Sequence, residues 1–339
     1  MKTVKILLLG FGVIGRGFAK VLLEKSEYIK KKHDVELRVV GIGEHNGCLV
    51  DEKGIDLKAA LELREKGKWI DSLPQWKKMS AKDMIKSIPA DLAVEVVPSD
   101  IKTGEPGVGL LEAALSKGLH VVSSDKCAIA NKFSDLMVLA RKQNKWLLFE
   151  ASAGGGMPLM NLVRECIQAD EIRSMEGILN GTTNYILTKM SRGGMDLETA
   201  LREAQELGYA EADPTYDVEG IDAAAKAVIL ANDIMGMSKK FSDVKVTGIR
   251  GITKEAVQLA KKNGYVIKLI AEIKDNKLSV GPKIIPENHP LNIESNLNAV
   301  MFKTDIGKDI VIIGRGAGGR ETQSAIFSDV LRICKDLQS

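Results

Sequence analysis

One charged pair stands out in the segment Glu219–Ile234, which reads EGIDAAAKAVILANDI. Asp222 and Lys226 are four residues apart, so a helix would place both on one face. The other residues of this helix are mostly small or apolar, which indicates that the lysine is buried. Burial lowers the proton affinity of an ammonium group, and a carboxylate one turn away would hold it in place. The pair therefore predicts a proton donor and acceptor for a substrate oxygen, with a surface ion pair as the simpler interpretation.

Two polar stretches come before this helix in the chain. Leu207–Pro214 reads LGYAEADP and brings Glu211 close to the helix start, where a carboxylate would bind an ammonium group or would simply be solvated. Ile178–Tyr185 reads ILNGTTNY, a strand followed by an amide and two hydroxyls at the start of a helix. Such groups cap helices, and they also bind carboxylates because helix N-terminal donors favour anions. The candidates are Asn180, Gly181 and Thr182.

A glycine-rich turn follows the first apolar run of the chain. Val4–Leu9 reads VKILLL, as expected of a buried parallel strand, and GFGVIG comes directly after it. Between a strand and a helix, bare backbone and helix N-terminal amides receive a pyrophosphate. The motif predicts dinucleotide binding, with a tight turn as the alternative. Its glycines are Gly10, Gly12 and Gly15.

The end of the second predicted strand carries one acidic residue, Glu44. An acid in this position of a dinucleotide-binding fold accepts hydrogen bonds from the adenosine ribose and favours NAD over NADP. The polar segment Ile29–Asp34 lengthens the usual spacing, however, and His45 follows Glu44 without an adjacent arginine. An ordinary exposed carboxylate is an equally good interpretation.

The scaffold for these residues follows from the alternation of apolar runs. In the first half, strands are expected at Val4–Leu9, Val35–Ile42, Leu92–Val97, His120–Ser123 and Trp146–Glu150. Helices are expected at about Gly15–Ile29, Leu110–Ser116 and Phe133–Gln143. The segment Cys48–Ile88 is interpreted as an insertion with helical pieces at Leu57–Lys66 and Ala81–Lys86. Elsewhere strand and helix alternate, which predicts an α/β domain with a doubly wound parallel sheet.

The character of the chain changes after the glycines at 154–156. A strand at Ser174–Leu179 is followed by helices at about Tyr185–Ser191, Leu197–Glu206 and Ile221–Ile234. Two strands, Val266–Ile273 and Leu278–Ile285, are joined by a hairpin turn at Asp275 and Asn276. This half is therefore expected to be an α+β domain. We predict a first domain at 1–150, a second at 151–319, and a final helix within 320–339 that packs back onto the first.

Length and composition exclude several functions. At 339 residues, the chain exceeds what one core usually organises. Its 48 basic and 45 acidic side chains nearly cancel and are scattered, so no nucleic-acid partner is expected. The four cysteines lack the spacing of a zinc site. No apolar run is long enough to span a membrane and no signal peptide is evident, which predicts a soluble, cytoplasmic protein without a membrane partner.

Taken together, GILNGTTNYIL and LGYAEADPTYDVEGIDAAAKAVILA resemble the two most diagnostic stretches of the homoserine dehydrogenase family. The resemblance continues in chain order through GFGVIG, EVVPSD, SSDKCAIAN, EASAGGGMP, HPL and GRGAGG. It implies interconversion of L-homoserine and L-aspartate 4-semialdehyde with NAD or NADP, in the biosynthesis of threonine, methionine and isoleucine. It also implies a Rossmann-type doubly wound parallel sheet plus an α+β substrate and dimerisation domain, and hence a homodimer.

The resemblance implies roles for individual residues. Lys226 becomes the proton donor and acceptor, with Asp222 as its companion. Glu211 matches the residue that binds the substrate ammonium, and Lys126 matches the one between cofactor and substrate. The family's cofactor contacts fall at Gly12, Val13, Ile14, Ser99, Lys126 and Gly316. The carbonyls that hold a structural sodium ion in relatives fall at Glu150, Ala153, Gly155 and Met157. The stretch GIGEHNG around Glu44 matches neither coenzyme, so the choice between them stays open.

Two other functions are alternatives for this sequence. Aspartate-semialdehyde dehydrogenase handles the same aldehyde through a thioester, which requires an activated cysteine. Only Cys127 and Cys166 lie near plausible site segments, and neither has a histidine close in sequence. A dinucleotide-sensing module without catalysis would have no use for the charged residues Lys126, Glu211, Asp222 and Lys226.

Overall fold

The computed structural model of the chain describes residues 1–338. They form two compact units. Unit 1 comprises Met1–Ser152 together with the chain from Gly319 onward, and unit 2 comprises Ala153–Gly318. The boundaries predicted at 150 and 319 lie within two residues of these. Among the described residues, no helix has the length and apolar character needed to cross a membrane.

Unit 1 is built on a seven-stranded sheet with the order β4-β3-β2-β1-β5-β6-β7. Five neighbouring strands of this sheet, β2, β1, β5, β6 and β7, are parallel. Strands β3 and β4 extend the sheet beyond β2 as antiparallel strands. The strand order reverses between β1 and β5, which is where sheets of this type bind ligands. The strands are β1 (Lys2–Leu9), β2 (Val35–Glu44), β3 (Gly47–Val50), β4 (Trp76–Lys77), β5 (Leu92–Glu95), β6 (His120–Ser123) and β7 (Leu147–Leu148).

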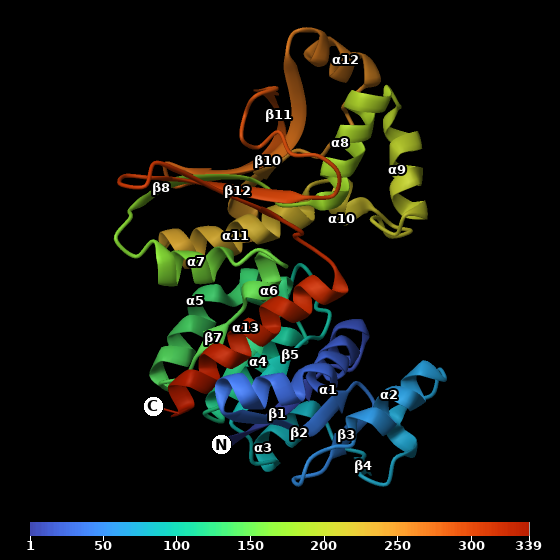
Figure 1. The fold of residues 1–339 in the computed structure, drawn as a ribbon, viewed down its shortest axis with the longest axis vertical. Helices are drawn as coiled ribbons and strands as arrows, with labels where there is room; N and C mark the ends of the chain where they lie inside the picture. The colour runs from blue at the N-terminus through green and yellow to red at the C-terminus, as the bar shows by residue number, and fades with distance from the viewer. Residues whose placement is uncertain (339) are drawn as a thin grey trace. The chain divides into compact units, whose positions relative to one another are not determined.

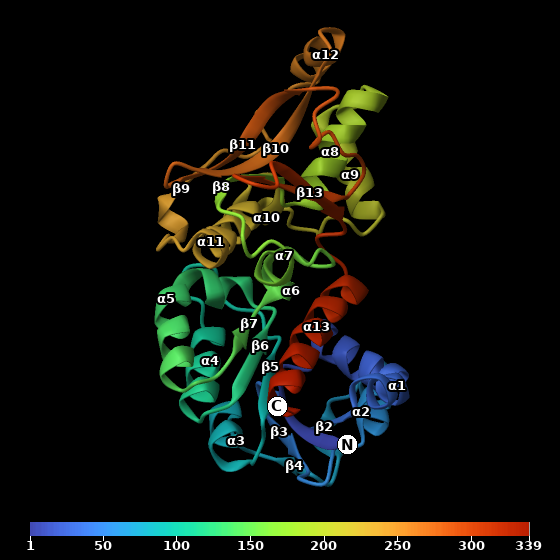
Figure 2. The same ribbon diagram turned by 60° about the vertical axis from the view of Figure 1, so that its left-hand side comes forward.

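Helices cover both faces of this sheet, as the near-continuous apolar runs of the parallel strands require. Figure 2 shows α1 and α13 on one face and α4 and α5 on the other. The helices are α1 (Val13–His33), α2 (Leu57–Glu65), α3 (Ala81–Ser87), α4 (Gly107–Ser116), α5 (Lys126–Lys142) and α13 (Gly319–Gln338), with a short α6 (Glu150–Ala153) after β7. The predicted doubly wound α/β fold is confirmed.

Helix α13 completes the core of unit 1 although it follows unit 2 in the chain. Its ring Phe327 stacks on Phe18 of α1 with the ring centroids 4.6 Å apart. Gln323 donates a hydrogen bond to the carbonyl of Ile14 at 3.0 Å. The apolar face of α13, including Val330 and Ile333, is buried in the same cluster as β1.

Two predicted elements of unit 1 are corrected. Helix α5 begins at Lys126 and not at Phe133, because the Asp125 carboxylate caps it by accepting from the amides of Cys127 and Ala128. The sequence pattern missed this first turn because the helix is broken at Lys132, where φ is −130° and ψ is 27°. The strand expected at Trp146–Glu150 is reduced to the two residues of β7, since Glu150 starts α6.

Unit 2 contains a six-stranded mixed sheet with the order β13-β12-β8-β10-β11-β9. Strand pairs are antiparallel except for β11 and β9. The hairpin between β10 and β11 turns at Asp275 and Asn276, both with positive φ, as the sequence predicted. The strands are β8 (Ile172–Ile178), β9 (Val244–Val246), β10 (Tyr265–Lys274), β11 (Lys277–Pro286), β12 (Asn298–Thr304) and β13 (Asp309–Gly314).

Helix α11 lies along one face of this sheet (Figure 1) and is buried without interruption from Asp222 to Asn232. A left-handed Gly220 precedes it and a left-handed Gly236 ends it. The helices of unit 2 are α7 (Leu159–Cys166), α8 (Gly181–Gly193), α9 (Leu197–Glu206), α10 (Thr215–Val218), α11 (Ile221–Met235) and α12 (Lys254–Lys262). The predicted α+β character of this half is confirmed.

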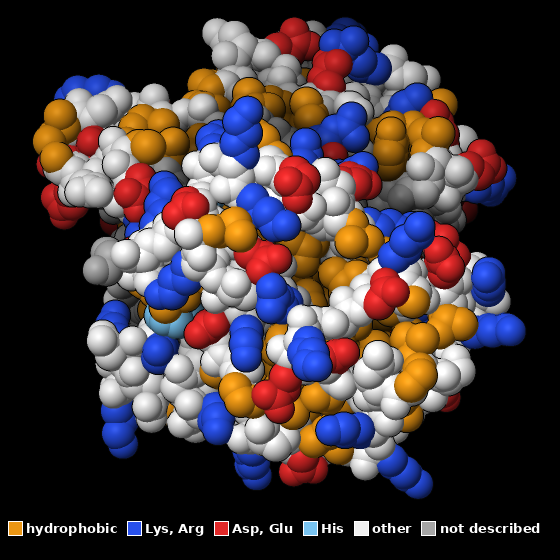
Figure 3. Space-filling model, turned by 60° about the horizontal axis from the view of Figure 1, so that its bottom comes forward, with side chains coloured by type: hydrophobic (Ala, Val, Ile, Leu, Met, Phe, Trp, Pro, Cys, Tyr) orange, Lys and Arg blue, Asp and Glu red, His pale blue; other side chains and the backbone are white. Residues whose placement is uncertain are grey.

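The charges on the drawn surface are mixed in sign. On the face shown in Figure 3, Lys and Arg side chains are interspersed with Asp and Glu side chains. This face therefore lacks the continuous basic stripe that tracks a phosphate backbone.

Candidate functional site

The predicted lysine and aspartate form a buried ion pair on helix α11. Lys226 Nζ lies 2.9 Å from Asp222 Oδ2, and both residues are less than a tenth exposed. The ammonium also donates to the carbonyl of Leu179, at the end of β8, at 3.0 Å. An isolated buried charge is costly, so the carboxylate and the carbonyl together account for a charged lysine in this position. The surface ion pair considered from the sequence is therefore wrong.

A second aspartate joins this pair through an amide. Asn180 Nδ2 donates to Asp222 Oδ2 at 3.0 Å and to Asp217 Oδ1 at 2.7 Å. Burial, followed by repulsion from Asp222, raises the pKa of Asp217. The sequence did not predict a role for Asp217. The signal that could have identified it is its position on the short helix α10, just before the helix α11 that carries Lys226. The structure thus assembles two carboxylates, an amide and an ammonium within unit 2.

The polar groups at the start of α8 have defined partners. Asn180 caps α8, its Oδ1 accepting from the amide of Thr183 at 2.9 Å. Thr182 Oγ1 donates to the carbonyl of Tyr209 at 2.7 Å. Gly181 is packed tightly, since a side-chain carbon there would overlap the carbonyl of Asn296. The capping interpretation is thus confirmed for Asn180, and binding of a substrate carboxylate at these residues stays a prediction.

Glu211 lies on the exposed turn between α9 and α10. Its backbone carbonyl accepts from Gln205 Nε2 at 3.0 Å, which anchors the turn to α9. The side chain does not share the hydrogen-bonded network of Asp217 and Asp222 in the described residues. Its predicted contact with a substrate ammonium stays a prediction.

The glycine-rich turn of unit 1 has the geometry that a pyrophosphate requires. Gly10 adopts a φ of 106°, a conformation that residues with a side chain rarely adopt. A side-chain carbon at Gly15 would overlap the backbone of Gly10, whereas one at Gly12 would meet no atom within 4 Å. Gly12 is the N-cap of α1 without a side-chain cap, and Val13 and Ile14 open the helix. The positive, N-terminal end of α1 is therefore not covered by a side chain at Gly12.

Glu44 ends β2 and its side chain is only 5% exposed. Burial, the largest effect, raises its pKa, and Arg64 beside it lowers it. Arg64 Nε lies 4.0 Å from Glu44 Oε1 and the guanidinium stacks on Trp69 at 4.3 Å. Glu44 Oε2 is buried and has no hydrogen-bond partner among the described residues. The ordinary exposed carboxylate considered from the sequence is therefore wrong, and the orphaned oxygen fits a ribose hydroxyl.

The carboxyl ends of β5 and β6 carry further predicted cofactor residues. Ser99 Oγ accepts from the amide of Gly107 at 2.9 Å, which ties the turn after β5 to α4. Lys126 is the first residue of α5, three residues after the end of β6. Between these turns lies a fully buried carboxyl group, that of Glu95, the first residue of the EVVPSD stretch, for which the sequence predicted no role. Burial, followed by repulsion from Asp125, raises the pKa of Glu95 to about 8.

The remaining predicted residues lie at bends of the chain. In unit 2, a side-chain carbon at Gly155 would overlap the backbone of Gly316, so the absence of a side chain at Gly155 lets the two backbone segments lie close together. The amide of Met157 donates to the carbonyl of Gly154 at 2.9 Å, closing a turn. Glu150 belongs to unit 1, and Ala153 opens unit 2. No described group of three or more acidic, histidine or cysteine side chains could hold a metal, and the sodium predicted at main-chain carbonyls stays a prediction.

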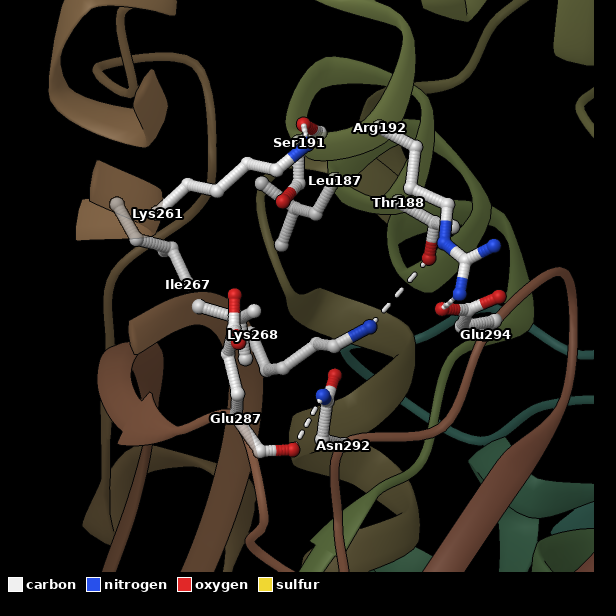
Figure 4. Close-up of a pocket in the computed structure, with 11 residues that line it drawn as sticks. Leu187, Thr188, Ser191, Arg192, Lys261, Ile267, Lys268, Glu287, Asn292 and Glu294 are labelled. Carbon is white, nitrogen blue, oxygen red and sulfur yellow. Dashed lines mark hydrogen bonds and ion pairs between the residues drawn. The ribbon is translucent and has the colours of Figure 1, made fainter. Parts of the chain in front are cut away.

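A cavity of about 510 Å³ in unit 2 is lined by a different lysine, Lys268 of β10. Figure 4 shows its Nζ directed at Thr188, with the Arg192 and Glu294 pair at the rim. Lys268 is 3% exposed and donates to Asn184 Oδ1 at 2.9 Å, Thr188 Oγ1 at 3.3 Å and the carbonyl of Ile293 at 2.5 Å. Burial lowers its pKa to about 8.

Comparison with known proteins places both units in one family. The model described as homoserine dehydrogenase matches residues 158–331, and the model described as the NAD binding domain of homoserine dehydrogenase matches residues 10–150. The homoserine dehydrogenase of Methanocaldococcus jannaschii is 50% identical over 329 residues, which cover 97% of this chain and 98% of that protein.

Two solved structures have the same fold. A putative homoserine dehydrogenase from Archaeoglobus fulgidus superposes with a TM-score of 0.89 at 42% identity, covering 97% of this chain and 99% of that one. A hyperthermophilic archaeal homoserine dehydrogenase in complex with NADPH superposes with a TM-score of 0.84 at 30% identity, covering 98% of each chain.

Proposed function

The chain belongs to the homoserine dehydrogenase family, and we propose that it interconverts L-homoserine and L-aspartate 4-semialdehyde with NAD or NADP. The observation that carries the proposal is the buried ion pair between Lys226 and Asp222, which is joined through Asn180 to Asp217. We place the enzyme in the cytoplasm, as a homodimer in the biosynthesis of threonine, methionine and isoleucine.

Lys226 acts at the substrate oxygen. An ammonium group has three hydrogen-bond donors. The described contacts of Lys226 use two of them, one with Asp222 and one with the carbonyl of Leu179, so the third can meet a substrate oxygen. In oxidation, the alcohol carbon loses a hydride and the alcohol oxygen loses a proton, which the neutral lysine takes up. In reduction, the ammonium gives the proton back. Asp222 holds the amine in place and compensates its charge when the lysine is protonated.

The substrate ammonium pairs with carboxylates of unit 2. Burial and the neighbouring Asp222 raise the pKa of Asp217 more than the Lys226 ammonium lowers it, so a substrate ammonium at its carboxyl would favour the ionised form. Glu211 is the second candidate, supported by the resemblance alone. The substrate carboxylate would use the amides at the start of α8, around Gly181 and Thr182.

The cofactor binds in unit 1. The open Gly12 at the start of α1 suits the pyrophosphate, and the buried, orphaned Glu44 Oε2 suits a ribose hydroxyl. When bound, the nicotinamide supplies the hydride acceptor or donor. Ser99 and Lys126 are the other proposed contacts in unit 1, and Gly316 is the proposed contact in unit 2.

The direct test is turnover by the purified protein. Homoserine with NAD or NADP should yield the reduced coenzyme, and the semialdehyde should oxidise it again without phosphate. Phosphate-dependent turnover of the semialdehyde would favour the thioester enzyme instead. Absence of turnover with intact coenzyme binding would favour a binding module. The thioester route would have to use Cys127 or Cys166, because burial raises the pKa values of the other two thiols, Cys48 and Cys334, to about 11 and about 12 and makes them poor nucleophiles.

The coenzyme preference is tested at Glu44. If its carboxylate accepts from the ribose, Glu44→Ser should weaken NAD more than NADP, because the repulsion of a 2′-phosphate disappears with the charge. Initial rates with both coenzymes would measure this, and Glu52→Ser, at an exposed acid of the same unit, is the control. Equal effects on both coenzymes would remove Glu44 from the ribose site.

Two parts of the proposal concern assembly and metal. The homodimer is tested by sedimentation of the purified chain. The sodium ion at Glu150, Ala153, Gly155 and Met157 is tested by thermal unfolding in sodium and in potassium buffers at equal ionic strength. A monomer, or identical unfolding in the two buffers, would contradict the corresponding part.

A further inference from the structure

Glu95 ends strand β5 and is fully buried at the carboxyl edge of the unit 1 sheet. Its partners in register are Leu9 of β1 and Ser123 of β6. The glycine-rich turn lies against the next residue, since a side-chain carbon on Gly10 would come within 3.1 Å of the carbonyl oxygen of Val96. The carboxyl group therefore lies where the strand order reverses, beside the proposed pyrophosphate turn.

The two oxygens of Glu95 reach two different turns. Oε1 accepts from the amide of Val97 at 2.8 Å, within the turn that leads to Ser99. Oε2 lies 2.5 Å from Ser123 Oγ, which in turn accepts from the amide of Asp125 at 3.0 Å. The backbone carbonyl of Glu95 accepts from the amide of Ser124 at 3.1 Å. A single residue thus joins the turn after β5 to the turn that starts α5 at Lys126.

Two carboxyl groups share this edge, and their surroundings differ. Burial, the largest effect, raises the pKa of Asp125, but the amides of Cys127 and Ala128 at the positive end of α5, from which its carboxylate accepts, and Lys126 oppose this. Glu95 accepts from one amide and is more deeply buried. Its other neighbours at this edge are the apolar Leu9 and the backbone of the glycine turn, so Asp125 is the ionisable group that acts on it. The proton therefore belongs to Glu95 and the negative charge to Asp125.

We propose that Glu95 is a positioning residue that, as a neutral acid, holds the turns bearing Ser99 and Lys126 in the geometry that binds the coenzyme. The inference rests on the proposed function, since both residues are expected to contact NAD(P). The Ser123 hydroxyl donates to Oε2 of the carboxylate; in the neutral acid this contact reverses, so that Oε2 donates to Ser123 Oγ while Oε1 still accepts from the amide of Val97. Loss of its proton places a second negative charge at the edge that receives the negative pyrophosphate. Like charges repel, so coenzyme affinity falls as Glu95 ionises.

The test compares the wild type with three variants. Glu95→Gln keeps one acceptor and one donor in place without a charge, and Glu95→Ala removes both. Asp91→Asn is the matched control, because Asp91 bridges β5 to β1 in the same way at the opposite end of the strand, accepting from the amide of Lys5 at 2.8 Å. Binding of NADH and NADPH is titrated by fluorescence at several pH values, and kcat and the coenzyme KM are measured with homoserine.

The wild type should bind the coenzyme more weakly above about pH 8, by up to about tenfold per pH unit if binding requires the protonated acid. Glu95→Gln should keep the neutral-pH affinity and lose this alkaline weakening. Glu95→Ala should raise the Kd and the coenzyme KM about tenfold at every pH, with a smaller change in kcat, as expected for the loss of a hydrogen-bonded link. Asp91→Asn should match the wild type in both profiles.

An alkaline weakening in Glu95→Gln equal to that of the wild type would overturn the inference, and so would an unchanged Kd in Glu95→Ala. If Glu95→Ala does not fold, Glu95→Gln alone decides. Failure of the proposed function is recognised separately. In that case the wild type itself neither turns over homoserine nor binds a coenzyme, whereas failure of the inference leaves an active wild type with indistinguishable Glu95 variants.

Discussion

Unit 2 buries two lysines, and their surroundings differ in one respect. Lys226 on α11 meets a carboxylate, Asp222, at 2.9 Å. Lys268 on β10 meets neutral oxygens of Asn184, Thr188 and Ile293, and no carboxylate of the described residues lies within ion-pair distance. Lys226 belongs to a polar network with Asn180 as its centre. Lys268 instead ties β10 to α8 and to the loop before β12.

With Lys226 proposed as the catalytic lysine, the difference means that burial alone would not have distinguished it from Lys268. All three donors of Lys268 are used, so it has none left for a ligand, and burial lowers its pKa to about 8. Lys226 keeps a donor beyond its two described contacts and has an acid that compensates its charge. The pairing with a carboxylate, and not the depth of burial, is therefore the feature that indicates chemistry here.

The largest effect is expected when the amine of Lys226 is removed. Lys226→Ala should lower kcat by about 10²–10⁴-fold while the Kd of the coenzyme stays unchanged, because general acid–base groups contribute this much. Lys268→Met is the matched control and should retain kcat within about threefold, since it touches no reacting atom. More than about a tenth of wild-type activity in Lys226→Ala would contradict the assignment. Circular dichroism of both variants checks the fold.

A smaller effect is expected at the partner carboxylate. Asp222→Asn keeps the shape but removes the charge that compensates Lys226, and one charge-assisted hydrogen bond is worth about 1.5–3 kcal/mol. We expect kcat to fall about tenfold or more on that basis. Asp233→Asn, at another aspartate of α11 that pairs with Arg164, is the control for the helix. A fall in kcat as large in Asp233→Asn as in Asp222→Asn would show that the effect is on the helix and not on the lysine.

The smallest effect concerns Lys268 and appears in stability. Its pKa in the folded protein, about 8, lies below the ordinary value of 10.5, so between these values the unfolded chain binds more protons. The free energy of unfolding should therefore rise with pH across this window, by about 1–2 kcal/mol between pH 7.5 and 9.5. Well below pH 8 both states are protonated and the contribution is constant.

Urea unfolding of the wild type and of Lys268→Met at each pH isolates this contribution. The difference between the two curves cancels the opposing ionisation of the buried thiols of Cys48 and Cys334. A difference that does not change with pH would show that Lys268 does not titrate in this range. Unchanged activity of Lys268→Met at each pH would show that Lys268 contributes to stability and not to catalysis, unlike the role proposed for Lys226.

Local pattern was enough to predict much of the fold and the centre of the site. Leu197–Glu206 and His120–Ser123 have the predicted bounds, because each is a short element with clear flanking signals. Asp222 and Lys226 were found because both lie on one helix, four residues apart in a run of alanines. Helical spacing and composition are properties that one segment carries by itself.

The residues that were missed depend on distant parts of the chain. Glu95 ends a four-residue strand, and its burial follows from its two neighbouring strands and from Asp125, 30 residues later. Asp217 becomes unusual only when Asn180, 37 residues earlier, is placed beside it. Lys268 looks like an exposed strand position until Asn184, 84 residues away, supplies its acceptor. Such long-range pairings cannot be derived from local periodicity.

Unit 1 is made of two segments of the chain, one before unit 2 and one after it. This arrangement decides the order in which the two units can fold during synthesis. Residues Ile326, Phe327, Val330 and Ile333 belong to the same core as β1. The ribosome makes them after the whole of unit 2, which is one continuous segment. Unit 2 can therefore fold while the chain is still being made, whereas the first half waits with an open hydrophobic face until α13 emerges. Coenzyme-binding competence is thus acquired last, although its glycine-rich turn is made first.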